Sequence, residues 1–302
     1  MNLLGFGPTP TIEITFGGED RSEVTVKADG PKGASNVTET LPLFTGVETV
    51  SGQVRVSPPP GKKVEHVGIK IELLGQIELN FDKGNYYDFI SLVRELDAPG
   101  ELAAAKVYPF EFARVDMQHE SYNGINVRLR YLLRVTVGRN YASNVVKNFR
   151  FWVRNLHDVP AINHCIKMEV GIEDCLHIEF EYQRSKFHLK DIVVGKIFFL
   201  LVRIKIKHME VEIRRRESTG SGPNMYTESD TIAKYEIMDG APVRGESIPV
   251  RLMLSPYDLT PTYRSIANKF SVKYYLNLVL VDEEDRRYFK QQEITLFRKE
   301  LV

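Results

Sequence analysis

The sequence predicts an all-β protein built from two antiparallel β-sandwich domains in tandem, with one short helix in the first domain. Three observations predict this fold. Apolar and polar residues alternate from Ile12 to Phe16, from Ile69 to Leu73 and from Ile178 to Tyr182, as in strands that bury one face and wet the other. Turn signals such as Pro58–Gly61 and Asp239-Gly240 separate these runs. The same order of strand-like segments also occurs twice.

The repeat consists of four short segments of the first half that return in the same order in the second half. Matched segments are 135 to 144 residues apart, which favours two copies of one β domain joined head to tail. Two such domains are typical of a binding scaffold. The matched pairs are Ser51–Val54 with Val194–Ile197, Ile69–Ile71 with Ile204–Ile206, Tyr108–Phe112 with Ile248–Leu252, and Tyr131–Val137 with Tyr275–Val281.

The chain is long enough for two domains, because each half of its 302 residues can bury a core of its own. The segment Leu156–Ala161 carries a proline and shows no clear alternation, so it marks the junction. We therefore predict one β-sandwich domain over residues 1–160 and a second over residues 161–302.

One segment of the first domain departs from the β pattern. Asn85 precedes it as a candidate N-cap, and Pro99-Gly100 closes it. Its apolar residues fall at helical spacing, which predicts a short amphipathic helix packed on the first sandwich. These residues are Tyr86, Phe89, Ile90, Val93 and Leu96.

Composition excludes several classes of protein. The formal net charge is zero, so no overall electrostatic attraction to nucleic acid is expected. Two cysteines in a chain of this size favour a reducing, cytoplasmic compartment. Residues Met1–Pro10 do not read as a signal peptide. The most apolar stretch, Ile192–Ile206, is too short and too charged to span a bilayer, so membrane association is expected to be indirect.

The search for catalytic motifs is negative, and two clusters could hold a metal ion. His164, Cys165, Cys175 and His177 are possible zinc ligands, but adjacent strand residues point to opposite faces, and buried structural side chains are the alternative. The acidic run Asp282–Asp285 could hold calcium, although its place between two strand-like stretches favours a solvated hairpin loop.

A basic stripe is a further candidate for binding. Arg203, Lys205 and Lys207 alternate along the sequence and are predicted to project from one face of a strand, and Arg214–Arg216 follow shortly after. Such a stripe could contact phospholipid headgroups or an acidic partner, or it could be the wet face of an antiparallel sheet.

Two apolar pairs suggest binding surfaces. Ile237 and Met238 directly precede Asp239-Gly240, so they either form an exposed apolar loop that contacts a partner or lie half-buried at a β-bulge. Tyr288 and Phe289 open the last strand, whose exposed edge could accept a peptide as an additional strand. A buried aromatic residue is the simpler interpretation of the second pair.

Five longer segments carry a resemblance to a known family: Lys63–Gly68, Glu120–Tyr131, Ile166–Tyr182, His188–Lys196 and Leu278–Ile294. They resemble the vacuolar protein sorting-associated protein 26 family, the arrestin-like subunit of the retromer complex. The resemblance covers nearly the whole chain and implies two arrestin-like sandwiches, no catalysis and no cofactor or metal.

The resemblance also implies partners. A loop of the second domain would bind the α-solenoid scaffold subunit of retromer, with Ile237 and Met238 as apolar anchors beside Tyr235, Asp239 and Gly240. The protein would be cytoplasmic and recruited peripherally to endosomal membranes, where it would take part in retrograde transport.

A second surface would hold cargo-receptor tails together with a phox-homology sorting nexin. Val170 and Phe289 would form its pocket, and the strand from Tyr288 to Ile294 would pair with the tail. The alternative function is an arrestin-like adaptor that binds phosphorylated receptor tails directly through the basic stripe.

Overall fold

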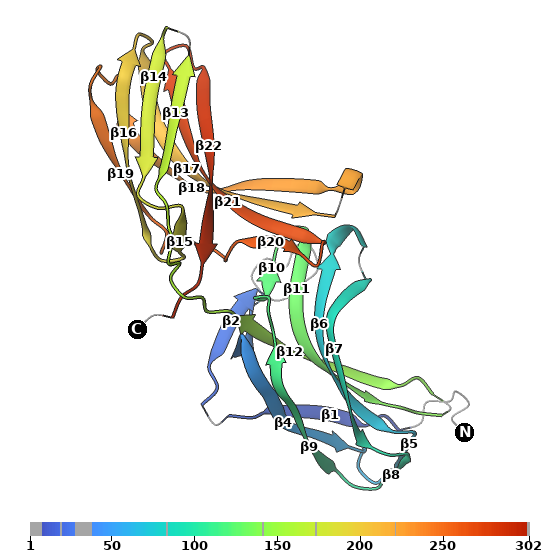
Figure 1. Cartoon of the computed structure of the whole chain (residues 1–302). Helices are drawn as coiled ribbons and strands as arrows, with labels where there is room; N and C mark the ends of the chain where they lie inside the picture. Colours follow the sequence, from blue (N-terminus) through green and yellow to red (C-terminus); the bar gives the residue numbers. More distant parts are fainter. Residues whose placement is uncertain are drawn as a thin grey trace. The chain divides into compact units, whose positions relative to one another are not determined.

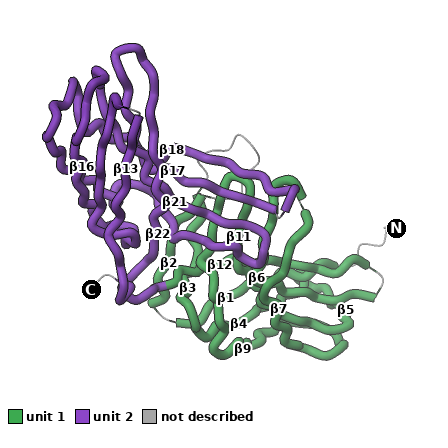
Figure 2. The backbone as a smooth tube through the Cα atoms, turned by 45° about the horizontal axis from the view of Figure 1, so that its top comes forward, with its two compact units in different colours: residues 1–155 green, residues 156–302 purple. Residues whose placement is uncertain are grey.

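The computed structural model describes residues 8–18, 20–27, 38–82, 84–140, 142–172, 174–220 and 222–300. In these ranges the regular structure is almost entirely β, with two single-turn 3-10 helices, η1 (Asn80–Asp82) and η2 (Gly222–Asn224). The chain divides into two compact units, residues 1–155 and 156–302 (Figure 2). None of the described helices is long and apolar enough to cross a membrane.

The first unit contains two principal sheets. A three-stranded sheet has the order β1-β4-β9, and a larger sheet has the order β2-β3-β12-β11-β6-β7, with β10 beside β11 and a small β5–β8 pair apart (Figure 1). The strands are β1 (Thr11–Phe16), β2 (Glu23–Lys27), β3 (Thr38–Thr45), β4 (Val47–Ser57), β5 (Val64–His66), β6 (Ile69–Leu79), β7 (Tyr86–Asp97), β8 (Gly100–Leu102), β9 (Lys106–Asp116), β10 (Tyr122–Asn123), β11 (Val127–Val137) and β12 (Val145–Arg154).

Aromatic side chains join the two sheets of the first unit. The ring of Phe16 on β1 lies 5.8 Å from that of Phe44 on β3 and 6.1 Å from that of Phe151 on β12. Phe44 and Phe151 are buried and in edge-to-face contact at 4.9 Å. The inner faces of the two sheets therefore form one core, as in a β-sandwich.

The second unit repeats this plan. Its sheets have the orders β13-β14-β16-β19 and β15-β22-β21-β17-β18, and β20 pairs with β21. Its strands are β13 (Ile166–Ile172), β14 (Leu176–Tyr182), β15 (Lys186–His188), β16 (Ile192–Val202), β17 (Ile206–Thr219), β18 (Tyr226–Asp239), β19 (Ser247–Met253), β20 (Tyr263–Ile266), β21 (Phe270–Asp282) and β22 (Arg287–Phe297).

The sequence repeat corresponds to equivalent strands of the two units. Its first and third segments lie on β4 and β9 in one unit and on β16 and β19 in the other, and each pair is antiparallel. The fourth segment lies on β11, paired with β6, and on β21, paired with β17. Each large sheet also contains one parallel pair, β12 with β3 and β22 with β15. The all-β, two-domain fold is thus confirmed.

A glycine keeps the same role in both copies of the repeat. Gly52 on β4 pairs with Phe16 and Gly195 on β16 pairs with Tyr182. A Cβ atom on Gly52 would collide with the carbonyl oxygen of Thr15. One on Gly195 would lie 2.6 Å from the carbonyl oxygen of Glu181. Both positions require glycine because the neighbouring backbone approaches closely.

The predicted helix is wrong. Strand β7 occupies Tyr86–Asp97 and pairs antiparallel with β6, with register shifts that leave Phe89 and Leu96 without a direct partner. These bulges break the strict period-two alternation, so the apolar residues acquire a spacing that resembles a helix. Phe89 packs over Gly75, because a Cβ atom added to Gly75 would lie only 2.7 Å from the Phe89 ring.

The division between the units falls after Asn155, near the predicted boundary at residue 160. Asn155 is buried, and its side-chain amide donates to the carbonyl oxygens of Met117 (3.1 Å) and Gln118 (2.7 Å). Asn155 therefore links the end of β12 to the segment that follows β9, within the first unit.

Candidate functional site

The second unit presents open strand edges. In the described residues, β13 pairs only with β14, and β18 pairs along its length only with β17. Strand β22 pairs with β21 from Arg287 to Ile294, whereas β15 joins its other edge only from Thr295 to Phe297. Among the described strands, none pairs with the second edge of β22 from Arg287 to Ile294, as the edge argument from the sequence predicts.

The candidate scaffold-binding residues form the end of a strand rather than a loop, which corrects the sequence prediction. Strand β18 continues to Asp239, and the turn begins only at Gly240, whose φ is +107°. Glu236 pairs with Glu210 and Met238 pairs with Met209, so Ile237 is the extra residue of a β-bulge. Ile237 and Met238 are both half-buried, as the bulge alternative requires.

This strand end is firmly held. The Tyr235 hydroxyl donates to the carbonyl oxygen of Met253 (2.9 Å), and its ring lies 6.1 Å from that of Tyr257. Burial, followed by the hydrogen bond with Tyr257, raises the pKa of Tyr235, so the hydroxyl remains a donor at neutral pH. The amide of Gly240 donates to the carbonyl oxygen of Lys207 (2.7 Å).

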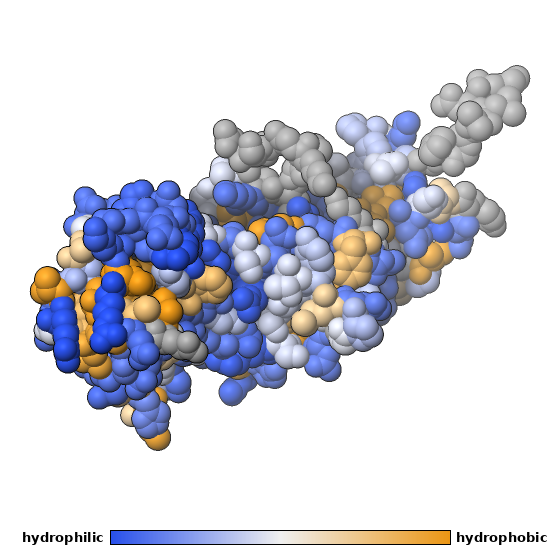
Figure 3. Space-filling view, turned by 90° about the horizontal axis from the view of Figure 1, so that it is seen from above, coloured by the Kyte–Doolittle hydropathy of each residue, from blue (hydrophilic) through white to orange (hydrophobic). Residues whose placement is uncertain are grey.

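On the face seen in Figure 3, apolar side chains reach a largely hydrophilic surface in several places. Met253, next to the Tyr235 hydrogen bond, is 57 % exposed, and Phe289 is 68 % exposed. We call Tyr235, Ile237, Met238 and Met253 the β18-end surface. Met253 was not among the residues predicted from the sequence, because only the fold brings β19 close to β18.

Phe289 and Tyr288 lie on opposite faces of their sheet. Tyr288 pairs with the fully buried Leu280 and faces the core, whereas Phe289 pairs with Val279 on the outer face. There Phe289 borders a cavity of about 220 Å³ together with Glu212 and Asn277.

Val170 and Phe289 lie on different sheets and on different faces. Val170 is half-buried on β13 and pairs with the fully buried Ile178, so it faces the space between the sheets. Ile294 is only 1 % exposed and packs in the core opposite Tyr274. The Ile294 side chain therefore supports β22 from the core, while the pairing of a tail along the strand from Tyr288 to Ile294 stays a prediction.

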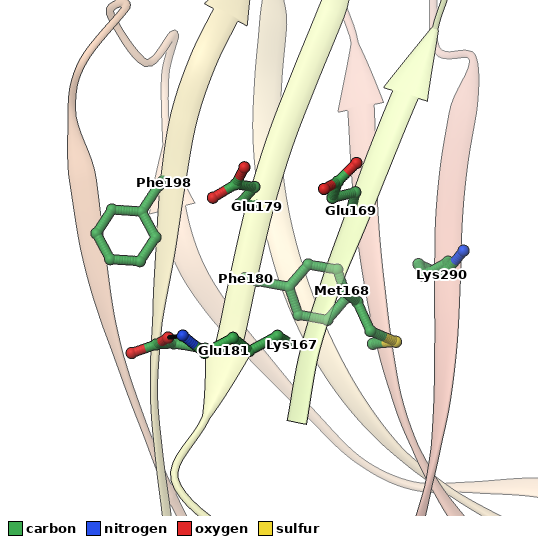
Figure 4. Close-up of a pocket in the computed structure, with 8 residues that line it drawn as sticks. All are labelled: Lys167, Met168, Glu169, Glu179, Phe180, Glu181, Phe198 and Lys290. Carbon is green, nitrogen blue, oxygen red and sulfur yellow. Dashed lines mark ion pairs between the residues drawn. The ribbon is translucent and has the colours of Figure 1, made fainter. Parts of the chain in front are cut away.

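The edges of β13 and β22 border a common cavity. Lys290 of β22 lines a cavity of about 500 Å³ together with Lys167, Met168 and Glu169 of β13 and residues of β14 and β16 (Figure 4). An extended chain that pairs with β22 would therefore run beside β13, within reach of Val170.

The acidic run forms the hairpin turn between β21 and β22, and its first carboxylate is fully engaged. The Asp282 side chain accepts hydrogen bonds from the amides of Glu284 (3.0 Å) and Arg286 (2.9 Å), from Arg286 Nε (2.7 Å) and from the Tyr288 hydroxyl (3.0 Å). Burial opposes ionisation, but the hydrogen bonds from Arg286 and Tyr288 outweigh it and lower the pKa of Asp282. These bonds make the residue a structural support for the turn.

Replacing Asp282 with Asn is expected to destabilise the protein at pH 7. A carboxyl whose pKa is lower in the folded state stabilises the fold above its unfolded pKa, near 4, and loses that effect as the pH falls. The difference from wild type in urea-unfolding midpoint should therefore shrink below about pH 4. Asp285→Asn is the control, because this carboxylate is 76 % exposed in its pair with Lys207. A pH-independent loss would contradict the ionic role of Asp282.

The basic stripe is interrupted and paired. Strand β16 ends at Val202 and β17 begins at Ile206, so Arg203 and Lys205 lie in the connection rather than on one strand face, a correction to the sequence prediction. Five cations lie close to acidic or polar partners: Lys205 with Glu283, Lys207 with Asp285, Arg214 with Glu212, Arg215 with Asp230 and Arg216 with Gln291.

The proposed histidine and cysteine ligands do not meet. Cys165 precedes β13, whereas Cys175 lies in the turn at the far end of that strand, and both are free thiols. His177 lies instead beside Glu169 and Glu179, with donor atoms within 4.8 Å of one another. The sequence pattern gave no sign of these glutamates, because their proximity depends on the register of β13 and β14.

The chain matches the family described as vacuolar protein sorting-associated protein 26 over residues 6–285. It is 64 % identical over 298 residues to vacuolar protein sorting-associated protein 26B of Arabidopsis thaliana, covering 98 % of this chain and 97 % of the relative. It is 59 % identical over 303 residues to vacuolar protein sorting-associated protein 26 of Dictyostelium discoideum, covering 99 % and 85 %.

A similar relationship holds with vacuolar protein sorting-associated protein 26B of Xenopus tropicalis, with 59 % identity over 302 residues, 99 % of this chain and 88 % of the relative. Matches of this identity across nearly the full length leave no part of either unit outside the relationship. The chain belongs to the vacuolar protein sorting-associated protein 26 family.

Proposed function

We propose that this protein is a non-enzymatic, arrestin-like adaptor subunit of a retromer-type complex in intracellular protein sorting. The observation that carries the proposal is the match to relatives named for vacuolar protein sorting over 98–99 % of the chain. In this role the protein is cytoplasmic and is recruited peripherally to endosomal membranes, where it serves retrograde transport.

The β18-end surface is the proposed contact for the α-solenoid scaffold subunit. Its support is physical: a bulge holds Ile237 and Met238 half-exposed, and hydrogen bonds from Tyr235 and Gly240 fix the strand end. The Tyr235 hydrogen bond ends on the carbonyl oxygen of Met253, whose side chain is exposed. A preorganised apolar surface loses little conformational freedom when a partner covers it.

The open edge of β22 is the proposed contact for cargo-receptor tails, held together with a phox-homology sorting nexin. An extended tail can add to this edge through backbone hydrogen bonds, while side-chain contacts provide specificity. Phe289 offers an apolar contact on the outer face, and Val170 lies at the neighbouring edge of β13. Tyr288 and Ile294 anchor the strand to the core.

Replacing Phe289 with Ala is expected to weaken binding of a cargo-tail peptide, in the presence of the sorting nexin, at least tenfold. Truncation of an aromatic hot-spot residue in an interface costs about 2 kcal/mol or more, which corresponds to a roughly 30-fold increase in Kd. Isothermal titration calorimetry measures the effect. Phe81→Ala is the matched control, because Phe81 is 66 % exposed and lies in the first unit.

Binding of the scaffold subunit by the same variant distinguishes the loss of a cargo contact from misfolding. Phe289→Ala should bind the scaffold subunit like wild type, because Phe289 and the β18-end surface lie on different strands. Equal loss of cargo and scaffold binding, or unchanged cargo binding, contradicts the proposed site.

The alternative function, direct recognition of phosphorylated tails, has weaker physical support. Most cations of the basic stripe already lie beside carboxylates, and a phosphate would have to displace these partners. Tail binding should accordingly not depend on phosphorylation; a large phosphate-dependent gain that disappears at high salt would favour the alternative.

A further inference from the structure

An exposed cluster on the four-stranded sheet of the second unit combines three metal-ligating side chains. Glu169 projects from β13, and His177 and Glu179 project from β14 on the same outer face. Glu169 is directly opposite Glu179 in the antiparallel register, and Gly171 is opposite His177. Figure 4 shows both glutamates beside one cavity. The three donor atoms lie within 4.8 Å of one another.

Two like charges face each other in this cluster. Two carboxylates directly opposite each other across a strand pair repel. The adjacent cross-strand pair on the same face is complementary, with Lys167 Nζ 3.3 Å from Glu181 Oε2. Within the described residues, no lysine or arginine forms an ion pair with Glu169 or Glu179. The register thus places two like charges opposite each other, whereas the neighbouring cross-strand pair combines opposite charges.

His177 provides a second, independent sign of a missing partner. Its Nε2 atom is covered by neighbouring atoms and makes no hydrogen bond in the structure, while the side chain as a whole is 43 % exposed. It lies 3.8 Å from Glu169 Oε2, which is too long for a hydrogen bond. Shielded ring nitrogens normally have a partner, and an unsatisfied one requires an explanation. Gly171 opposite His177 leaves that position free of a side chain.

We propose that Glu169, His177 and Glu179 form a zinc-binding site on the outer face of β13 and β14. Imidazole and carboxylate are established Zn²⁺ ligands, whereas Mg²⁺ and Ca²⁺ prefer oxygen ligands alone. Two atoms bound to one Zn²⁺ at roughly 2.1 Å lie no more than about 4.2 Å apart. His177 and Glu169 already meet that limit at 3.8 Å, and the exposed glutamates can close the remaining separation by small rotations.

Three protein ligands leave at least one coordination position for water. Bound zinc would neutralise the two opposed carboxylates and link the edge strand β13 to β14. The site would therefore stiffen the edge strand that borders the cavity of Figure 4.

The test is calorimetric titration of ZnCl₂ into the full chain without a histidine tag, in the Cys165→Ser, Cys175→Ser background. We expect one zinc per chain. His177→Gln and Glu179→Gln should each lower the affinity at least tenfold, and MgCl₂ should give no binding. Glu181→Gln is the matched control, because Glu181 lies on the same strand and face but pairs with Lys167; its affinity should equal that of the parent.

Histidine-selective NMR supplies a second readout that does not depend on the variants. Substoichiometric Zn²⁺ should shift the ring resonances of His177 before those of the other six histidines. Three results overturn the proposal: no zinc binding, binding unchanged in His177→Gln, or first perturbation of a different histidine. Circular dichroism of each variant establishes that a lost signal does not come from unfolding.

Discussion

Replacing Ile237 with Asp is expected to weaken binding of the retromer scaffold subunit by about 2–4 kcal/mol, a roughly 30-fold to 1,000-fold increase in Kd. Ile237 is the extra residue of the bulge in β18 and is half-buried in the free protein. A partner that covers the β18-end surface would enclose an aspartate that lacks a counter-ion. The penalty for an uncompensated buried charge accounts for the expected loss.

Strand β18 contains its own matched control. A second register shift between Ile213 and Arg214 makes Ile232 the extra residue of another bulge, and Ile232 is also half-buried. Ile232→Asp therefore places the same charge in the same local geometry outside the β18-end surface. Calorimetry should show near wild-type scaffold affinity for this control. Equal losses for both variants would reveal a general effect on β18, and unchanged affinity of folded Ile237→Asp would exclude this strand end as the contact.

The sequence predicted the architecture well because the relevant signals are local. Period-two alternation identifies a half-buried strand without knowledge of its partners. The repeat matched segments that proved to be equivalent strands, β4 with β16 and β11 with β21. A strand of one copy and its counterpart in the other meet the same packing demands, so similar residues occur in both.

Predictions failed where the outcome depends on register. The bulges of β7 gave a strand the apolar spacing of a helix. The residues around Ile237 were expected in a loop, but they lie in a paired strand that contains a bulge. The faces that Val170 and Phe289 occupy could not be predicted from their own segments, because the neighbouring strands decide them. The cluster at His177 was missed for the same reason. Register is set by contacts between distant residues, which no single segment specifies.

Replacing Gly195 with Ala is expected to destabilise the second unit by about 3 kcal/mol, the upper end of the cost of overpacking. The new Cβ atom would lie 2.6 Å both from the carbonyl oxygen of Glu181 and from Tyr182 Cδ1. The first obstacle is backbone inside a paired strand, and the second belongs to a side chain that is 1 % exposed. Neither can move without separating β14 from β16.

Gly171→Ala is the matched control for this change, because a Cβ atom there would meet nothing closer than the Leu176 carbonyl oxygen at 3.9 Å. In this open position alanine should be neutral or slightly stabilising, since it restricts the unfolded chain. Hydrogen exchange at the amides of β14 and β16 measures the local effect, and urea unfolding measures the global one. Equal stability of the two variants would mean that the strands yield easily. The recurrence of glycine at positions 52 and 195 would then reflect shared ancestry without a packing constraint.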